Sequence, residues 1–132
     1  MKQLDSFDFF GKDAEFDHAG IAVKSIDDVL RNVQKTKDPI QKVSVAMIRI
    51  NNFKVELVEP ISDHSPVTKI LGKGQSIYHL CFRVQNINIA IEIARKNGFH
   101  CIAKPTPAEA FNNKRIAWLF NKFYGLIELL EK

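Results

Sequence analysis

Apolar and polar positions alternate most clearly in residues 76–86, which read SIYHLCFRVQN. The apolar side chains from Tyr78 to Val84 recur at every second position, which predicts a half-buried strand over Ile77–Val84 with its apolar face packed on a helix. The opposite face of this strand would carry Ile77, His79, Cys81 and Arg83. An imidazole, a thiol and a guanidinium are unusual on the buried face of a strand, so this strand is a candidate for a functional site.

The same pattern occurs 61 positions earlier, where residues 16–26 read FDHAGIAVKSI against IYHLCFRVQNI later in the chain. The constant offset aligns His18 with His79. A second pair of similar stretches follows, VELVE in the first half and IELLE at the end of the chain, which aligns Glu56 with Glu128. Two copies of one plan predict two modules that close on each other rather than a solenoid.

In the first half, a period of two predicts strands over Phe16–Val23, Val43–Ile50 and Phe53–Glu59. Asn51-Asn52 separates the last two strands and is a candidate for a two-residue hairpin turn. Each half of the chain therefore carries a His on its first strand and a Glu on its last strand.

Between the first two of these strands, the pattern predicts a short helix and a turn. Ser25 looks like the N-cap of a helix that runs to about Lys35, because apolar residues fall at helical spacing after it: Ile26, Val29, Leu30 and Val33. Thr36–Gln41 contains Asp38-Pro39 and is expected to form a turn.

A short linking helix and a longer second helix are predicted in the rest of the chain. The linking helix starts at Ser65-Pro66 and ends at Gly72 and Gly74. Asn86 caps the second helix, whose buried stripe would be Ile87, Ala90, Ile91 and Ala94. The second half is completed by a strand, a loop and two further strands: Phe99–Ala103, Lys104–Asn113, Arg115–Phe120 and Leu126–Leu130.

These elements indicate an α+β fold in which each half is a βαβββ module, with one strand of the first half undecided. A chain of 132 residues suits a single domain, 1–132. The first module is expected at 16–60 and the second at 76–131, with 1–15 as an N-terminal arm whose phenylalanines dock on the modules.

Composition argues against some classes of function. The net charge of +4 is spread along the chain, and without a basic run interleaved with aromatics a nucleic-acid partner is not expected. Apolar runs stay well short of the roughly 20 residues that span a bilayer, and charged residues interrupt the N-terminus, so neither a membrane partner nor a secretory leader is predicted. We therefore expect a cytoplasmic protein, with Cys81 and Cys101 reduced.

The four residues that the repeat aligns carry the strongest chemical prediction. Two imidazoles and two carboxylates suit a divalent cation of borderline character, so we expect one Zn, Co, Ni, Mn or Fe ion at a site formed by His18, Glu56, His79 and Glu128. The alternative is that both histidines are structural, because the sequence contains neither an HxxxH nor an HExxH motif.

The remaining candidates have simpler interpretations. His64 and His100 are expected to be bystanders, and Trp118 is expected to belong to the core. Arg83 either pairs with a carboxylate or phosphate of a substrate, in the same cavity as His79, or forms an ordinary salt bridge. Cys81 has no neighbouring base motif that would make it a nucleophile.

At these residues the chain resembles the vicinal oxygen chelate superfamily, which includes glyoxalases, bleomycin resistance proteins and extradiol dioxygenases. The similarity runs from Phe16 to Glu131, is strongest to methylmalonyl-CoA epimerase-like members, and rests on FDHAGIAV, KVELVEP with DHSPVTKILGKG, YHLCFRVQNI and GLIELLE. It implies a glyoxalase-like cupped mixed sheet of two βαβββ modules around one metal, here with a shortened first module. By this resemblance, the metal ligands are His18, Glu56, His79 and Glu128.

The resemblance also implies an activity. Such enzymes are metal-dependent isomerases or lyases that act through a metal-stabilised enolate, and here Glu128 and Glu56 are the candidate bases. The substrate would be a small molecule, either an acyl-CoA or another carbonyl compound, and the open sheet predicts a homodimer. Val45 stands where some epimerases carry a glutamate, so a base is absent there. Two alternatives stay open: another enzyme of the superfamily in secondary-metabolite or polysaccharide biosynthesis, or a non-catalytic small-molecule binding module.

Overall fold

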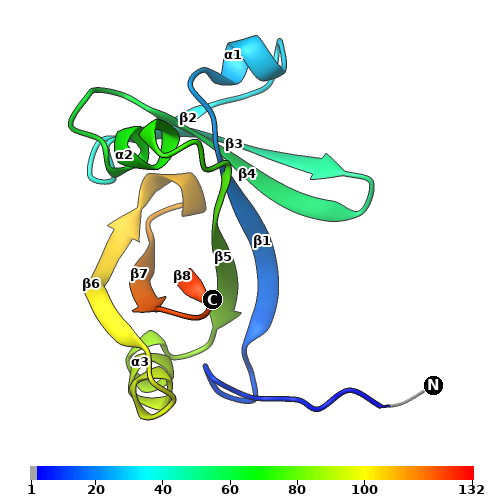
Figure 1. The fold of residues 1–132 in the computed structure, drawn as a ribbon, viewed down its shortest axis with the longest axis vertical. Coiled ribbons are helices and arrows are strands. Elements are labelled where there is room, and N and C mark those ends of the chain that lie inside the picture. The colour runs from blue at the N-terminus through cyan, green and yellow to red at the C-terminus, as the bar shows by residue number, and fades with distance from the viewer. Residues whose placement is uncertain (1–2) are drawn as a thin grey trace.

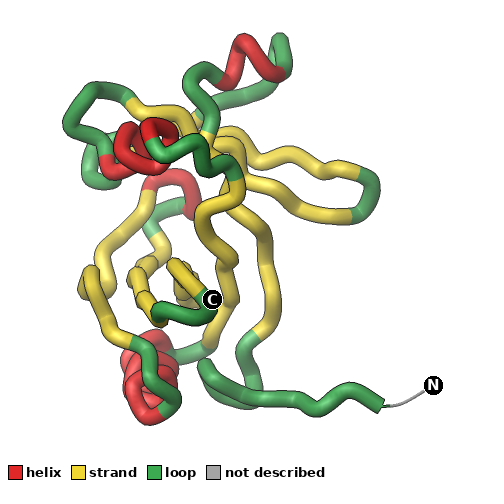
Figure 2. The backbone as a smooth tube through the Cα atoms, viewed as in Figure 1, coloured by secondary structure: helices red, strands yellow, loops and turns green. Residues whose placement is uncertain are grey.

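The computed structural model describes residues 3–132, in which one eight-stranded sheet curls into a cup (Figures 1 and 2). The strands are β1 (Glu15–Ala22), β2 (Thr36–Asp38), β3 (Val43–Ile50), β4 (Phe53–Pro60), β5 (Ile77–Val84), β6 (His100–Ala108), β7 (Lys114–Asn121) and β8 (Gly125–Glu131). The helices are α1 (Ile26–Val29), α2 (Pro66–Gly72) and α3 (Ile87–Lys96), and a 3-10 turn, η1 (Glu109–Phe111), links β6 to β7.

The sheet is built around a central antiparallel pair, β1 and β5. On one side β4 runs parallel to β1, and on the other side β8 runs parallel to β5. Hairpin partners extend each half outward and give the order β2-β3-β4-β1-β5-β8-β7-β6. The arrangement is the same outward from each central strand, which confirms the predicted α+β fold with a cupped mixed sheet.

Side chains alternate between the two faces of β8, and this alternation separates the core from the cup. Ile127 and Leu129 lie in a core cluster under α3, whereas Glu128 between them lies on the opposite face. The predicted stripe of α3 is buried in the same cluster: Ile87, Ala90, Ile91 and Ala94. Burial of the outer face against α3 therefore leaves the inner face of the sheet for polar groups.

The predicted N-terminal arm docks on this core only in part. Residues 1–2 of the arm lie outside the described residues. Phe10 is 7% exposed and belongs to the cluster under α3, with Phe9 packed beside it, whereas Phe7 is 70% exposed.

Two predicted helix caps are present, and a third is replaced by a carboxylate from a distant strand. Ser65 Oγ accepts from the Val67 amide, and Asn86 Oδ1 accepts from the Ile89 amide. Ser25, expected to cap α1, makes no such bond with its side chain; instead the Ile26 amide donates to Glu59 Oε1 at 2.6 Å. The end of β4 thus anchors the start of α1.

The segment between α1 and β3 differs from the sequence prediction. The helix expected to reach Lys35 is a single turn, because the backbone is already extended at Leu30 (φ −142°, ψ 127°) and becomes left-handed at Asn32 (φ 62°). The expected turn at Thr36–Gln41 begins instead with strand β2, whose Asp38 pairs with Val43. The residue before a proline favours an extended backbone, which suits Asp38 to a strand end.

The predicted loop Lys104–Asn113 is also wrong in part, because β6 continues to Ala108 before η1 begins. Pro105 and Pro107 favour a loop when the sequence is considered alone, but β6 is an edge strand, where a residue without an amide proton is tolerated. Irregular pairing with β7 on either side of Ala103 accommodates them further.

The two edges of the sheet meet across the mouth of the cup. Buried Asp38 of β2 accepts from the Glu109 amide of η1 at 3.2 Å. Trp118 Nε1 of β7 donates to Gln41 Oε1 at 3.3 Å. These two bonds join segments from opposite ends of the sheet order and close the space between them.

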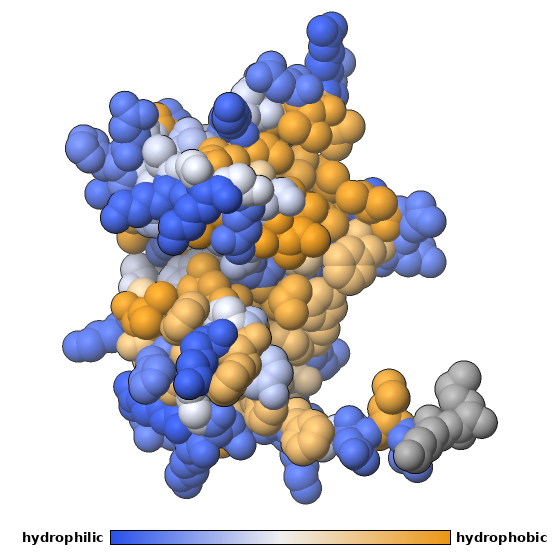
Figure 3. All heavy atoms as spheres, in the orientation of Figure 1, coloured by the Kyte–Doolittle hydropathy of each residue, from blue (hydrophilic) through white to orange (hydrophobic). Residues whose placement is uncertain are grey.

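Apolar side chains gather in a band over β1 and the β3–β4 hairpin, with charged groups around it (Figure 3). The band includes Phe16 and Phe53, which are 41% and 47% exposed and stack with ring centroids 5.5 Å apart. Within residues 3–132, the helices are too short or too polar to cross a membrane.

Candidate metal centre

Each of the four central strands contributes one polar side chain to a single buried cluster. His18 lies on β1, Glu56 on β4, His79 on β5 and Glu128 on β8, and their exposed fractions are 0%, 4%, 2% and 2%. The structure brings together all four residues that the repeat aligned. Register explains the meeting, because Gly20, two residues after His18, pairs both with Glu56 and with His79.

The donor atoms of the cluster are almost evenly spaced. His18 Nε2 lies 3.3 Å from Glu128 Oε1 and 3.5 Å from Glu56 Oε1. His79 Nε2 lies 3.2 Å and 3.5 Å from the same two oxygens, and the two Nε2 atoms are 3.5 Å apart.

This spacing and chemistry fit a divalent cation. Adjacent ligands of a metal with bonds of about 2.1 Å are separated by roughly 3.0–3.4 Å in octahedral or tetrahedral geometry. Glu128 Oε1 is buried without a hydrogen bond of good geometry from any residue in the described range. Two imidazoles and two carboxylates face one point, and one of the carboxylate oxygens, Glu128 Oε1, has no hydrogen bond of its own among the described residues. This is a donor set that Zn, Co, Ni, Mn and Fe accept.

The charges of the cluster hold one another in their ionised forms. Burial alone would raise the pKa of Glu56, but the imidazoles of His18 and His79 outweigh it and lower this pKa to about 2. Burial likewise opposes a charge on His79, yet Glu128 and Glu56 raise its pKa above the ordinary value. Without a cation, protons held on the imidazoles thus balance the negative charge of the two carboxylates.

A β-bulge precedes each histidine of the cluster. Between Phe16 and His18, β1 has one residue more than β5, and the extra residue is Asp17. Between Ile77 and His79 the extra residue is on β5, and it is Tyr78. A bulge turns the side chain of its extra residue away from strict alternation, so neither Asp17 nor Tyr78 lies where a period of two puts it.

Each histidine faces a small residue on the other central strand. Gly20 pairs with His79, and the equivalent residue of the second module, Cys81, pairs with His18. A Cβ on Gly20 would collide with Cε1 and Nδ1 of the His79 ring, so the ring occupies space that only glycine leaves open.

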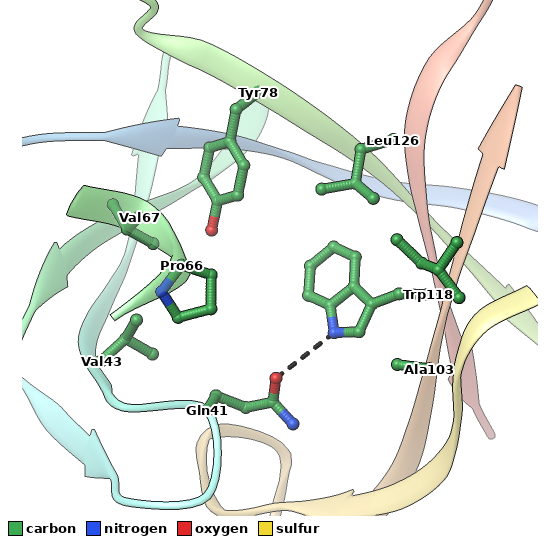
Figure 4. Close-up of a pocket in the computed structure, with 9 residues that line it drawn as sticks. Gln41, Val43, Pro66, Val67, Tyr78, Ala103, Trp118 and Leu126 are labelled. Atoms are coloured by element: carbon green, nitrogen blue, oxygen red, sulfur yellow. Dashed lines mark hydrogen bonds between the residues drawn. The ribbon is translucent and has the colours of Figure 1, made fainter. Parts of the chain in front are cut away.

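An apolar cavity of about 260 Å³ lies inside the cup beside this cluster (Figure 4). Tyr78 and Trp118 face each other across it, with the Tyr78 hydroxyl directed inward. Both aromatic rings also contact the ring of His79, with centroids 4.5 Å and 4.9 Å away. The polar side chains in the lining are those of Gln41, Tyr78 and Trp118.

The other candidates lie apart from this cavity or have a different role. His64 and His100 are exposed and distant from the cluster, as expected of bystanders. Arg83 forms a salt bridge with Asp17 at 3.1 Å, outside the lining of the cavity. Trp118, expected in the core, is half-buried and lines the cavity instead. Cys81 is buried, and burial raises the pKa of its thiol well above the usual value.

Sequence reasoning missed three residues at the cluster or its cavity: Asp17, Tyr78 and Gln41. A period of two puts Asp17 and Tyr78 on the outer face, and Gln41 falls in the predicted turn. One signal was present, because Asp17 and Tyr78 occupy equivalent positions of the repeat, each directly before a histidine of the cluster.

The chain is similar to other proteins over most of its length. It is 33% identical over 128 residues to the uncharacterized protein YqjC of Bacillus subtilis, covering 87% of this chain and 90% of YqjC. It is 26% identical over 127 residues to the ethylmalonyl-CoA/methylmalonyl-CoA epimerase of Cereibacter sphaeroides, covering 87% and 95% of the two chains.

A solved structure is also similar. A single-residue variant of methylmalonyl-CoA epimerase of Streptomyces coelicolor, in complex with 2-nitronate-propionyl-CoA, matches with a TM-score of 0.75 at 25% identity, over 89% of this chain and 94% of the epimerase. The family model of the Glyoxalase/Bleomycin resistance protein/Dioxygenase superfamily matches residues 17–118. The chain therefore belongs to this superfamily and is epimerase-like within it.

Proposed function

We propose that this protein is a metal-dependent isomerase that moves a proton at a carbon next to a carbonyl group. The observation that carries the proposal is the buried cluster of two imidazoles and two carboxylates, one from each central strand, beside a cavity inside the cup. Similarity to methylmalonyl-CoA epimerases supports the same reaction class.

We assign His18, Glu56, His79 and Glu128 as the ligands of one divalent cation, either Zn, Co, Ni, Mn or Fe. When bound, such a cation withdraws electrons from a carbonyl oxygen and makes the neighbouring C–H more acidic. Each module, 16–60 and 76–131, supplies one His and one Glu, so the ligand set requires the whole domain 1–132.

Glu128 and Glu56 are the groups that hold and move the proton. Val45, where some epimerases have a glutamate, is buried and paired with Val58, so a base must come from elsewhere. The carboxylates already lie at the cluster, with Glu128 Oε1 free of a hydrogen bond within the described part of the chain. A carboxylate at the reacting carbon is a competent general base.

The substrate class we propose is an acyl-CoA or a related small carbonyl compound. The Streptomyces coelicolor epimerase is solved with a CoA ester, which supports this choice. The cavity beside the cluster is mostly apolar, so it suits a non-reacting hydrocarbon group of the substrate, with the Tyr78 hydroxyl and Gln41 amide as the polar contacts.

We further propose a homodimer that covers the apolar band over β1 and the β3–β4 hairpin. Phe16 and Phe53 are large, stacked and exposed, as expected of side chains that a second copy covers. Light scattering on wild type and on Phe53→Asp tests this: a dimer that becomes a monomer supports the proposal, and a wild-type monomer contradicts it.

The reaction is tested by proton–deuterium exchange into methylmalonyl-CoA in D2O, followed by NMR, with metal content measured in parallel. Wild type is expected to hold close to one metal per chain and to catalyse exchange. His79→Ala is expected to lose both, because it removes a ligand. His64→Ala, which removes an exposed histidine of the linker, is the matched control and should retain both.

Two results would contradict the proposal in different ways. Wild-type protein that purifies without metal and does not take it up would instead be a binding module. Wild-type protein that holds metal but shows no exchange would favour a second candidate, an enzyme of the superfamily with a different carbonyl substrate. The specific observation in favour of that second candidate is Val45 in the place of a carboxylate.

A further inference from the structure

The side chain of Asp17 makes the shortest polar contact to the cluster without belonging to it. His18 Nδ1 donates to Asp17 Oδ2 at 2.6 Å. The Asp17 side chain is only 4% exposed, although its backbone lies at the bulge of β1. A carboxylate this deeply buried requires partners for its remaining lone pairs.

Two cations lie against the other oxygen of Asp17. Lys54 Nζ donates a hydrogen bond to Asp17 Oδ1 at 3.2 Å, and Arg83 forms an ion pair with the same oxygen, with Nε 3.1 Å away. Lys54 comes from β4 and Arg83 from β5, the strands on either side of β1. Oδ1 of Asp17 is therefore held by cations from both neighbouring strands, while Oδ2 accepts the hydrogen bond from the His18 imidazole.

This contact decides how His18 meets the cluster. An imidazole that donates from Nδ1 presents the lone pair of Nε2, which is the atom that lies 3.3–3.5 Å from the other donors. A carboxylate on the far nitrogen of a ligand histidine fixes both its tautomer and its ring orientation.

The second module lacks this arrangement. The equivalent bulge residue is Tyr78, which lines the cavity, and His79 Nδ1 is buried without a hydrogen-bond partner among residues 3–132. The ring of His79 is held by packing against Gly20, Tyr78 and Trp118. The two ligand histidines are thus positioned by different means.

We propose that Asp17 is a positioning residue of the metal site, which fixes His18 for coordination and is itself held by Lys54 and Arg83. The inference rests on the proposed metal site but not on the identity of the reaction. The ligand whose binding depends on Asp17 is a divalent cation coordinated by His18 Nε2.

The test is equilibrium binding of Zn2+, measured by competition with a chromophoric chelator, and of Co2+, measured by its visible absorption. Asp17→Ala is expected to lower the affinity for Zn2+ by about 10–100-fold. Asp17→Asn keeps the size and one acceptor oxygen but not the charge, so its loss should be intermediate. Glu15→Gln is the matched control, because Glu15 is an exposed carboxylate on the same strand that contacts Arg83 without touching His18, and it should leave the affinity unchanged.

A proton NMR measurement separates positioning from general stability. In the Zn2+-bound wild type, the Nδ1 proton of His18 should give a downfield resonance of the kind that short bonds to carboxylates produce. Asp17→Ala should lose this resonance, and the Co2+ spectrum should change in shape because the histidine ligand reorients. Both signals should persist in Glu15→Gln.

The outcomes separate this inference from the proposed function. Folded Asp17→Ala or Asp17→Asn with wild-type affinity and an unchanged Co2+ spectrum would overturn the role of Asp17 while leaving the metal site intact. Wild-type protein without measurable affinity for either metal would overturn the metal site itself. If Asp17→Ala does not fold, Asp17→Asn and the double variant Lys54→Met/Arg83→Met decide the question, since each is expected to weaken binding.

Discussion

The two halves of the cluster have the same histidine and glutamate but different supports. In the first half, His18 is held by a short hydrogen bond to Asp17 and by the cations behind it. In the second half, His79 has packing neighbours but no hydrogen bond at Nδ1 from the described residues. The repeat therefore preserves the histidine and the glutamate, whereas the residue before each histidine has diverged.

This difference suggests a division of roles within one site. The first half presents a charged network on the side away from the cavity, which suits the anchoring of a cation. The second half presents Tyr78 and Trp118 to the cavity, which suits contact with a substrate. Substitutions at equivalent positions of the two halves test this division.

The largest expected effect comes from the carboxylates. Glu56→Gln and Glu128→Gln should each lower the affinity for metal, and each should reduce deuterium exchange by about 100–10,000-fold, because a ligand or a base is lost. Measuring exchange at saturating metal separates the two losses. The carboxylate whose variant stays inactive when fully loaded is the base.

Equal recovery of both variants at saturating metal would show that neither carboxylate is the base. The proton would then have to be moved by a group outside the cluster.

The next effect comes from the small residues opposite the histidines. Gly20→Ala should displace the His79 ring, because the added Cβ would overlap with Cε1 of that ring. We expect a loss of roughly 1–3 kcal/mol in metal binding or folding stability, as for other overpacked sites. Cys81→Ala at the equivalent position removes one buried sulfur atom and should cost only about 1 kcal/mol.

Chelator-treated and Zn2+-loaded proteins, compared by thermal unfolding and zinc titration, provide the measurement. A Gly20→Ala variant that binds zinc as tightly as Cys81→Ala would show that the His79 ring has room to move, contrary to the close approach seen here.

Much of this comparison was predictable from the sequence. The offset of 61 between His18 and His79 was visible, and alternation placed His79 opposite the apolar face of its strand, where it meets His18 in the cluster. A period of two assumes an unbroken ladder, however, so it could not reveal the bulges at Asp17 and Tyr78. The sequence therefore did not reveal what supports each histidine, although it did reveal the four residues of the cluster.

The elements that the sequence misplaced depend on long-range contacts. The prediction of a helix to Lys35 relied on local spacing, whereas α1 is capped by Glu59 from β4. Strand β2 depends on pairing with β3 and on the bond from Asp38 to η1, far along the chain. Local propensity does not report partners of this kind.

The charge balance of the cluster predicts a pH dependence for the metal-free protein. The pKa of Glu56 falls from 4.5 to about 2 on folding, so its contribution to stability is present above pH 4.5 and lost as the pH falls. The pKa of His18 rises on folding from 6.5, so its contribution is complete below pH 6.5 and declines as the pH rises through the folded value. The free energy of unfolding should therefore be highest between pH 4.5 and pH 6.5, and lower by on the order of 2 kcal/mol in acid.

Thermal unfolding from pH 2 to 9, with chelator and with Zn2+, checks this window. Zinc requires neutral imidazoles, so its stabilising effect should grow as the pH rises above 6.5. Stability that increases steadily with pH in the presence of chelator would contradict the protonated cluster.

Tyr78 offers a smaller and more selective effect. Tyr78→Phe removes a hydroxyl that faces the cavity without removing the ring beside His79, so zinc affinity should stay unchanged. If the hydroxyl contacts substrate, catalytic efficiency should fall by about tenfold, the value of one hydrogen bond. Steady-state exchange kinetics with zinc titration measure both quantities. A variant with reduced zinc affinity and normal kinetics would instead assign Tyr78 to the support of His79.

The smallest effect concerns the carboxylates at the helix starts, which also occupy equivalent positions. Glu59 accepts from the Ile26 amide at 2.6 Å, and no side chain of the described residues caps α1 besides it. Glu131 accepts from the Ile87 amide at 3.4 Å, but Asn86 already caps α3, so the contact of Glu131 with the helix start adds little. Glu131 also accepts two hydrogen bonds from the Arg115 guanidinium, at 2.9 Å and 2.8 Å. Glu59→Gln should therefore cost about 1 kcal/mol in urea unfolding, and Glu131→Gln about half as much. The reverse order would mean that the Arg115 pair, rather than the helix start, is what Glu131 stabilises, and the two modules would then differ at their helices as well as at their histidines.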